Sequence, residues 1–257
     1  MREKIVAWPK VGLKSTAVLV WLLGGAGVLI AVFPWLKPAA CGRIQQRWFQ
    51  GLAKILGLRL MVRGRPVGEA ALVVSNHISW LDVVVLGAQA PFTFVAKSEV
   101  ANWPLIGFLA RRSGTLFVAR ASLRAASDLV QAVGAQLKAG KRVVVFPEGT
   151  TTCGETVLPF SHAVFQAVSG SGFPIQPVAL TYLGQAACFA PFLGEEAFVP
   201  HLIRLLGIDR IEVAVFWAAP LPSSERREVL ANRTYAAILD GICAFKAGKS
   251  NQAAGAF

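Results

Sequence analysis

The longest uninterrupted run of apolar residues lies near the start of the chain, at 17–33, and contains no charged side chain. With the next three residues, it approaches the ~20 residues that a membrane-spanning helix needs. Basic residues flank it on both sides, so the positive-inside rule favours neither orientation. The pattern therefore predicts a hydrophobic helical membrane anchor, which either spans the bilayer or enters one leaflet and returns.

Two other interpretations of this segment are weaker. A cleaved signal peptide needs small residues at its cleavage site, but Trp35, Lys37 and Pro38 stand there. A buried core helix does not need the basic flanks. The next stretch, 44–58, places apolar side chains at helical spacing with basic residues between them, which predicts an amphipathic helix at the membrane interface. Residues 1–58 are therefore assigned to an N-terminal membrane anchor.

From residue 59 onward, short β-rich apolar runs alternate with helical patterns. This alternation is typical of an α/β domain around a largely buried sheet. We expect a mostly parallel or mixed central sheet flanked by helices over 59–246, and a flexible tail over 247–257. The expected strands are 59–63, 71–75, 92–96, 115–118, 143–146, 176–182 and 211–217, and the expected helices are 80–90, 104–112, 122–139, 160–169 and 225–246.

Composition narrows the choice of partner. The 257 residues include 26 basic and 14 acidic side chains, a formal net charge of +12, and 54% of them are hydrophobic. Such a balance favours an anionic partner, either an acidic membrane surface or nucleic acid. A nucleic-acid-binding surface interleaves basic residues with exposed aromatic ones, whereas the aromatic residues here gather in the anchor and in apolar runs. We therefore expect an anionic membrane surface as partner and no nucleic acid.

The four cysteines, at 41, 153, 188 and 243, form no CxxC pair, and no Cys/His cluster has the spacing of a zinc site. Buried or free thiols of this kind are typical of a reducing compartment. We expect no metal site.

Candidate chemistry starts where an apolar run ends on the sequence SNHISWLD at 75–82. Ser79 can cap a helix that begins at Trp80, which leaves His77 in the turn between strand and helix. A carboxylate in the first turn, Asp82, can fold back to accept from Nδ1 of the imidazole and leave Nε2 free to take a proton from a hydroxyl. The alternative is a capping aspartate and a turn histidine bonded to the backbone.

A second signal follows the expected strand 143–146, which leads into the sequence PEGT at 147–150. A carboxylate at the end of a buried strand, before a glycine turn, is well placed to enter a pocket at the carboxyl edge of the sheet. Alone, Pro-Glu-Gly is a common turn. In combination with the histidine segment, Glu148 becomes a candidate site residue.

These segments resemble, in order, those of the 1-acyl-sn-glycerol-3-phosphate acyltransferase family of membrane-bound glycerolipid acyltransferases. The resemblance covers roughly residues 70–220, and the N-terminal anchor also fits. The sequences that carry it are NHISWLD at 76–82, FVAKSE at 94–99, WPLIG at 103–107, GTLFVAR at 114–120, FPEGT at 146–150 and IQPVAL at 175–180. Each block is weak alone, but together in this order they are specific.

The resemblance implies a membrane-bound enzyme that moves a fatty acyl group from an acyl thioester to the free hydroxyl of a lysolipid. The first choice of acceptor is 1-acyl-sn-glycerol-3-phosphate, giving phosphatidic acid. His77 would be the general base and Asp82 would orient it. Glu148 would hold the acceptor or stiffen the pocket, and Gly149 would allow close backbone approach beside an oxyanion donor. The other implied substrate-binding residues are Asn76, Lys97, Arg120 and Thr150, with the two basic side chains on an anionic head group.

Two departures from the family pattern bear on the acceptor. The block at 146–150 commonly continues with arginine but reads threonine at 150–152, and Ser161 and His162 stand where the family often carries lysine or arginine. Two expected phosphate ligands are therefore missing, and a lyso-ornithine lipid or another lysophospholipid stays open as acceptor. We interpret His162 as covering a helix start and His201 as structural.

The resemblance implies no cofactor beyond the acyl donor, which is either an acyl carrier protein (acyl-ACP) or a coenzyme A thioester (acyl-CoA). It places the enzyme at the inner (cytoplasmic) membrane, with the catalytic domain on the cytoplasmic face. Basic residues outside the blocks suit an anionic lipid surface, worth ~1 kcal/mol each, or an acidic carrier protein. They are Arg111, Arg112, Arg124, Lys138, Arg226 and Arg227.

Overall fold

A seven-stranded sheet forms the centre of the computed structural model, which describes residues 8–119 and 123–254. The strand order is β1-β7-β6-β2-β5-β3-β4. All neighbours are parallel except β6 and β7, so the sheet is mixed, as the sequence predicts. The strands are β1 Leu58–Arg63, β2 Leu72–Ser75, β3 Thr93–Lys97, β4 Leu116–Val118, β5 Val143–Val145, β6 Ile175–Leu183 and β7 Ile211–Trp217.

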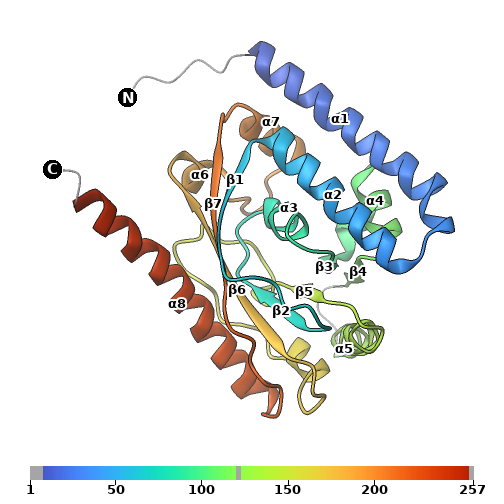
Figure 1. The fold of residues 1–257 in the computed structure, drawn as a ribbon, viewed down its shortest axis with the longest axis vertical. Coiled ribbons are helices and arrows are strands. Elements are labelled where there is room, and N and C mark those ends of the chain that lie inside the picture. The colour runs from blue at the N-terminus through green and yellow to red at the C-terminus, as the bar shows by residue number, and fades with distance from the viewer. Residues whose placement is uncertain (1–7, 120–122, 255–257) are drawn as a thin grey trace.

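Helices cover both faces of this sheet (Figure 1). They are α1 Trp8–Ala31, α2 Pro38–Leu56, α3 Leu81–Gly87, α4 Ile106–Arg112, α5 Leu123–Lys138, α6 Gln185–Phe189, α7 Phe198–Leu206 and α8 Arg227–Ala254, with 3-10 helices η1 Phe33–Trp35, η2 Ser98–Asn102 and η3 Ala163–Ala167. Side chains on β2 alternate between two cores, as strand geometry requires. Val73 packs with α2, α3 and α7, whereas Leu72 and Val74 pack with α5, η3 and α8.

The predicted elements differ from the structure in three places. The expected helix 160–169 is only the 3-10 helix η3, because glycines with positive φ at 170 and 172 turn the chain soon after it. Helices α6 and α7 have no counterpart in the prediction. Pro200 weakens the helical pattern of α7, although it stands in the first turn, where a proline is tolerated. Helix α8 continues past 246 to Ala254, so the predicted tail begins inside this helix.

Helices α1 and α2 form a hairpin that is closed by two tryptophan–glycine contacts. Trp21 on α1 lies over Gly51 on α2, and Trp48 on α2 lies over Gly25 on α1. A Cβ atom at Gly51 would lie 2.0 Å from the Trp21 ring, and one at Gly25 would lie 2.4 Å from Nε1 of Trp48. Each indole N–H also donates to the backbone carbonyl of the other tryptophan, at 3.0 and 3.3 Å. Only glycine lets the two helices approach this closely.

The apolar face of α2 is used inside the protein. Leu52 and Leu56 are buried in the core that α3 shares, and the Phe49 ring meets Phe94 edge-on at 6.0 Å. The side-chain amides of Gln46 and Gln50 donate to backbone carbonyls at the end of α3. The helix is amphipathic as predicted, but this face packs on the α/β domain instead of lying in the interface. Residues on both sides of the boundary predicted at residue 58 therefore share one hydrophobic core.

Helix α1 presents two different sides. Its buried residues, Val11, Val18, Gly25 and Leu29, follow one stripe, and the helix packs against α2, α4 and α7. Lys10 pairs with Asp209, and Lys14 donates to the carbonyl of Ile208 at 2.9 Å. The uncovered side carries exposed apolar residues, Trp8, Leu13, Leu19, Val20, Leu23 and Ile30. Among the described residues, Trp8–Trp35 is the segment long and apolar enough to cross a membrane.

Substituting Gly51 with alanine tests the helix hairpin. We expect Gly51→Ala to lower the free energy of unfolding in detergent by about 1–3 kcal/mol, because the methyl group overlaps the Trp21 ring. The matched control is Gly24→Ala on α1, where no heavy atom lies within 4 Å and helix propensity favours alanine by ~1 kcal/mol. Thermal unfolding of both variants measures the difference, and equal stabilities would contradict the contact as a constraint.

Candidate active site

Three predicted site residues lie at or just after the ends of parallel strands that are neighbours in the sheet. β5 pairs with β2 on one side and with β3 on the other. His77 follows β2, Glu148 follows β5, and Lys97 is the last residue of β3. The carboxyl ends of parallel strands meet at one edge of a sheet, where ligands of α/β proteins bind. The topology therefore brings these side chains to the same edge.

The imidazole of His77 is held from both sides. Its Nδ1 lies 2.9 Å from Oδ2 of Asp82, whose side chain is completely buried. The ring stacks on Phe146, with centroids 4.0 Å apart. The histidine side chain is 21% exposed, and Nε2 has no hydrogen-bond partner in the part of the chain that the structure describes. An ionised Asp82 requires a proton on Nδ1, which leaves Nε2 as the basic nitrogen.

Asp82 accepts four hydrogen bonds in total. Besides Nδ1, its Oδ2 accepts the backbone N–H groups of Ile78 at 2.7 Å and Ser79 at 2.9 Å. Its Oδ1 accepts the hydroxyl of Tyr182 at 2.7 Å. The predicted cap by Ser79 is wrong, because the Ser79 hydroxyl is buried without a partner among the described residues. The aspartate instead folds back over the turn and ties its backbone to the start of α3.

Tyr182 on β6 belongs to this site and sequence reasoning missed it. Burial, followed by the charge of Asp82, raises the pKa of the Tyr182 phenol well above its ordinary value. The phenol therefore stays protonated and always donates to the carboxylate. One signal was available in the sequence. The chain has two tyrosines, and one in a mostly apolar strand needs a buried hydrogen-bond partner.

Glu148 braces the histidine turn. Its Oε1 accepts the backbone N–H of His77 at 2.7 Å, and its Oε2 accepts that of Leu158 at 2.8 Å. Burial raises the pKa of Glu148, and these two hydrogen bonds offset part of the shift. The carbonyl of His77 accepts the backbone N–H of Thr152 at 2.9 Å. Of the two interpretations that the sequence leaves open for Glu148, this geometry favours stiffening the pocket.

Three other residues predicted to contact the substrate differ in their exposure to solvent. Asn76 is buried, its amide donating to the carbonyl of Leu180 at 3.0 Å and accepting the N–H of that residue at 2.8 Å. This pair continues the contact of β2 with β6, so Asn76 positions the turn, and its predicted place as a substrate contact is corrected. Gly149, with φ of +69°, and Thr150 lie on the exposed turn after Glu148.

Two basic residues and two further histidines complete the candidates. Lys97 is half-buried at the end of β3, whereas Arg120 lies outside the described residues. His162 occupies the N-cap position of η3, but its side chain makes no capping hydrogen bond, so the expected position is found without the expected cap. His201 is buried, with Nδ1 accepting the Trp80 indole N–H at 2.9 Å and Nε2 donating to the Pro191 carbonyl at 3.1 Å. Burial lowers the pKa of His201, so it is a neutral structural residue, as predicted.

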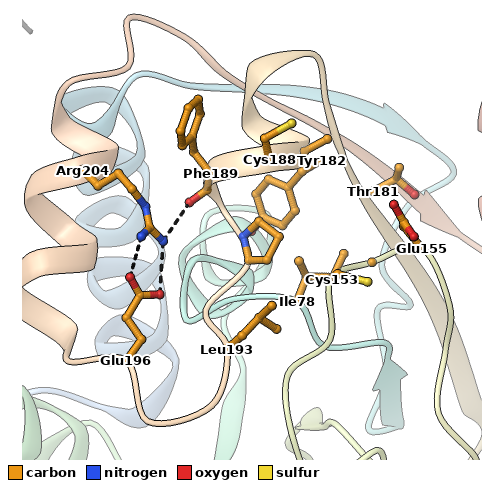
Figure 2. Close-up of a pocket in the computed structure, with 13 residues that line it drawn as sticks. Ile78, Cys153, Glu155, Thr181, Tyr182, Cys188, Phe189, Leu193, Glu196 and Arg204 are labelled. Atoms are coloured by element: carbon orange, nitrogen blue, oxygen red, sulfur yellow. Dashed lines mark hydrogen bonds and ion pairs between the residues drawn. The ribbon is translucent and has the colours of Figure 1, made fainter. Parts of the chain in front are cut away.

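A cavity of about 820 Å³ adjoins the histidine turn. Its wall includes Ile78, which directly follows His77, and Tyr182, which donates to Asp82. Figure 2 shows the segment after β6 and helix α7 on one side of this cavity and the loop around Cys153 on the other. Cys153 and Cys188 both line it, and all four cysteines are free thiols.

Comparison with known proteins bears on the fold and on the family of this chain. An Acyltransferase family model matches residues 59–181. A lyso-ornithine lipid O-acyltransferase from Pseudomonas aeruginosa is 39% identical over 184 residues, 70% of each chain. A 1-acyl-sn-glycerol-3-phosphate acyltransferase from Neisseria meningitidis is 32% identical over 184 residues, 70% of this chain and 72% of that protein.

The crystal structure of the 1-acyl-sn-glycerophosphate (LPA) acyltransferase PlsC from Thermotoga maritima has the same fold. Its TM-score is 0.62 at 20% identity, over 92% of this chain and 98% of that one. The mixed sheet and its flanking helices thus form an acyltransferase fold. The chain belongs to the acyltransferase family, as the resemblance in sequence predicts, and it is an enzyme of that family.

The hydroxyl of Tyr182 offers a test of the aspartate's surroundings. Tyr182→Phe removes one donor from a buried carboxylate, which costs about 1–3 kcal/mol of stability. We expect acyl transfer to fall about tenfold, because the carboxylate then holds the imidazole less firmly. Steady-state kinetics and thermal unfolding measure the two effects. Tyr235→Phe, which removes a hydroxyl bonded to Val157 on the other face of the sheet, is the control. A full rate in Tyr182→Phe would show that this hydrogen bond is not needed.

Glu148→Gln separates the two interpretations of Glu148. Glutamine keeps one acceptor oxygen, but its NH₂ group faces a second N–H donor, so the brace breaks at His77 or at Leu158. We expect kcat to fall about 100-fold through misplacement of the imidazole, with little change in KM for the acceptor. A rise in KM at unchanged kcat would instead identify Glu148 as an acceptor contact.

Proposed function

We propose that the protein transfers a fatty acyl group from an acyl thioester to the free hydroxyl of a lysolipid, with His77 as general base and Asp82 as its orienting residue. The observation that carries this proposal is the His77–Asp82 pair. Nδ1 is bonded to a buried carboxylate, and Nε2 is free on a partly exposed ring. A base of this kind needs no serine or cysteine nucleophile, so the proposal includes no acyl-enzyme.

The reaction is a direct transfer. Nε2 of His77 takes the proton of the lysolipid hydroxyl as its oxygen attacks the thioester carbonyl. A C–O bond forms, the C–S bond breaks, and the imidazolium returns the proton to the departing thiolate. Asp82 stabilises the imidazolium while it exists. The N–H of Gly149 donates to the Phe146 carbonyl at 3.2 Å, so we assign oxyanion stabilisation to the next amide of the turn, at Thr150.

Two acceptors fit this chemistry, 1-acyl-sn-glycerol-3-phosphate and lyso-ornithine lipid. By name, the relative from Neisseria meningitidis acts on the first and that from Pseudomonas aeruginosa on the second. Identity is higher to the second, 39% against 32%. The threonines at 150–152 and the pair Ser161 and His162, which replace expected basic residues, also favour an acceptor without a phosphate. Lys97 and Arg120 remain the proposed contacts to an anionic group of either acceptor.

The enzyme associates with membranes through its apolar N-terminal helix. In our proposal, the uncovered side of α1 enters the lipid of the inner membrane, while the buried stripe keeps the catalytic domain at the cytoplasmic face. This agrees with the packing of α1 on α4 and α7. The donor would be acyl-ACP or acyl-CoA, and the exposed arginines at 111 and 112 would meet the acidic carrier or anionic lipid.

Transfer of a labelled acyl group by purified protein in detergent tests the proposal directly. Wild type should acylate at least one of the two lysolipids. We expect His77→Ala to lower kcat by about 10³-fold, since base and orientation are lost together, and Asp82→Asn to lower it by about 10²–10⁴-fold. His162→Ala is the control for loss of an exposed histidine. A loss below about tenfold in His77→Ala would mean that another group takes the proton.

A further inference from the structure

The cavity beside the histidine turn has an amphiphilic lining. Apolar side chains of Ile78, Phe189 and Leu193 line it together with charged ones. Phe189 and Leu193 are both more than 40% exposed, as are Val199 and Ile203 on the neighbouring α7. Helix α7 packs against α1, the membrane helix. The cavity therefore lies next to a helix that packs on α1, and its wall combines apolar with charged side chains.

The charge of this cavity is opposite to that of the rest of the chain. Its charged residues are Glu155, Glu196 and Arg204. Arg204 and Glu196 pair with each other through two hydrogen bonds, at 2.6 and 3.1 Å. Glu155 has no hydrogen-bond or ion-pair partner among the described residues. The lining thus has a net charge of −1 in a protein of formal charge +12.

A second polar group in the wall also has no partner. Thr181 on β6 is 7% exposed, and its hydroxyl is buried without a hydrogen bond among the described residues. Buried polar groups are nearly always satisfied, so an orphaned hydroxyl in a cavity wall indicates a missing ligand or water. Figure 2 shows Thr181 and Glu155 at one end of the cavity and the Arg204–Glu196 pair at the other. The unused carboxylate and the unused hydroxyl thus belong to the same part of the wall.

We infer that this cavity binds the head group of the acceptor through a primary ammonium group, with Glu155 as its counter-ion and the Thr181 hydroxyl as a second acceptor. The inference rests on the proposed function and assigns it an amine-bearing lysolipid. An ammonium ion carries three donors and no acceptor, which matches a free carboxylate and a hydroxyl oxygen. The hydroxyl to be acylated would then extend past Ile78 to His77.

The same charges disfavour a phosphate in this cavity. A phosphate monoester is an anion with acceptor oxygens only, and it would meet the unpaired carboxylate of Glu155. The one guanidinium in the wall is already engaged, because Arg204 donates to both oxygens of Glu196. The cavity therefore distinguishes an amine-bearing head group from a phosphate by repelling the phosphate as well as by attracting the amine, which is a common route to specificity.

A pair of acceptors that differ only in the amine tests the inference. One is lyso-ornithine lipid and the other is the same lipid with its side-chain amine acetylated. We expect wild type to prefer the free amine. Glu155→Gln should raise KM for the free amine about fivefold, as an exposed ion pair is worth up to ~1 kcal/mol. Thr181→Val should raise it about threefold through the loss of one hydrogen bond. For both variants, kcat and the KM for the acetylated lipid should stay unchanged.

Glu195→Gln is the matched control, because Glu195 is exposed on the same segment as Glu196 but does not line the cavity. It should behave as wild type with both lipids. Equal KM values of wild type for the two lipids, or equal effects of Glu155→Gln on both, would overturn the inference and leave the proposed function intact. Calorimetric titration of both lipids identifies the opposite outcome, in which the cavity is assigned correctly but the proposed function is wrong. Amine-dependent binding that Glu155→Gln weakens, without any acyl transfer, would uphold the cavity and contradict the proposed function.

Discussion

The buried carboxylate of Asp82 is the constraint on which the active-site structure depends. A carboxylate without exposure to water is very unfavourable unless donors surround it. Four do so here, from Nδ1 of His77, two backbone amides and the Tyr182 hydroxyl. Those donors come from the turn after β2 and from Tyr182, near the end of β6. Satisfying one charge therefore fixes the turn, the tautomer of the imidazole and the position of a strand two-thirds of the way along the chain.

The remaining braces act on the backbone and leave the imidazole free. Glu148 accepts the N–H of His77, and the N–H of Thr152 donates to the His77 carbonyl. The side chain of Asn76, the residue before His77, is bonded to β6. All three come from loops or turns at the carboxyl edge of the sheet, which parallel pairing of β2 and β5 brings together. Among the described residues, the ring itself is held by Asp82 and by stacking on Phe146. Its Nε2 face can therefore meet a substrate without disturbing the supports.

Short-range patterns in the sequence predicted much of this. The seven strands were predictable because β-branched runs are bounded by turns, and the His77–Asp82 contact because the two residues are five apart across one turn. Tyr182 could not be found in this way, since its partner lies 100 positions away and only folding brings them together. The same holds for the cavity, whose wall combines the turn at Ile78 with the loop at Glu155 and with α7. Spacing along the chain carries no signal for such a set.

Attachment to the membrane and choice of acceptor are linked through α7. The stripe of α1 that packs on the domain contacts α7 and α4, so in our proposal the helix that enters the lipid is packed directly against α7. Helix α7 carries Arg204, which pairs with Glu196 at one end of the cavity (Figure 2). In the complex that we infer, the lysolipid meets apolar residues and the carboxylate of Glu155 in the same cavity. Discrimination between head groups would then take place beside the turn that carries His77, because Ile78 in the cavity wall directly follows this base.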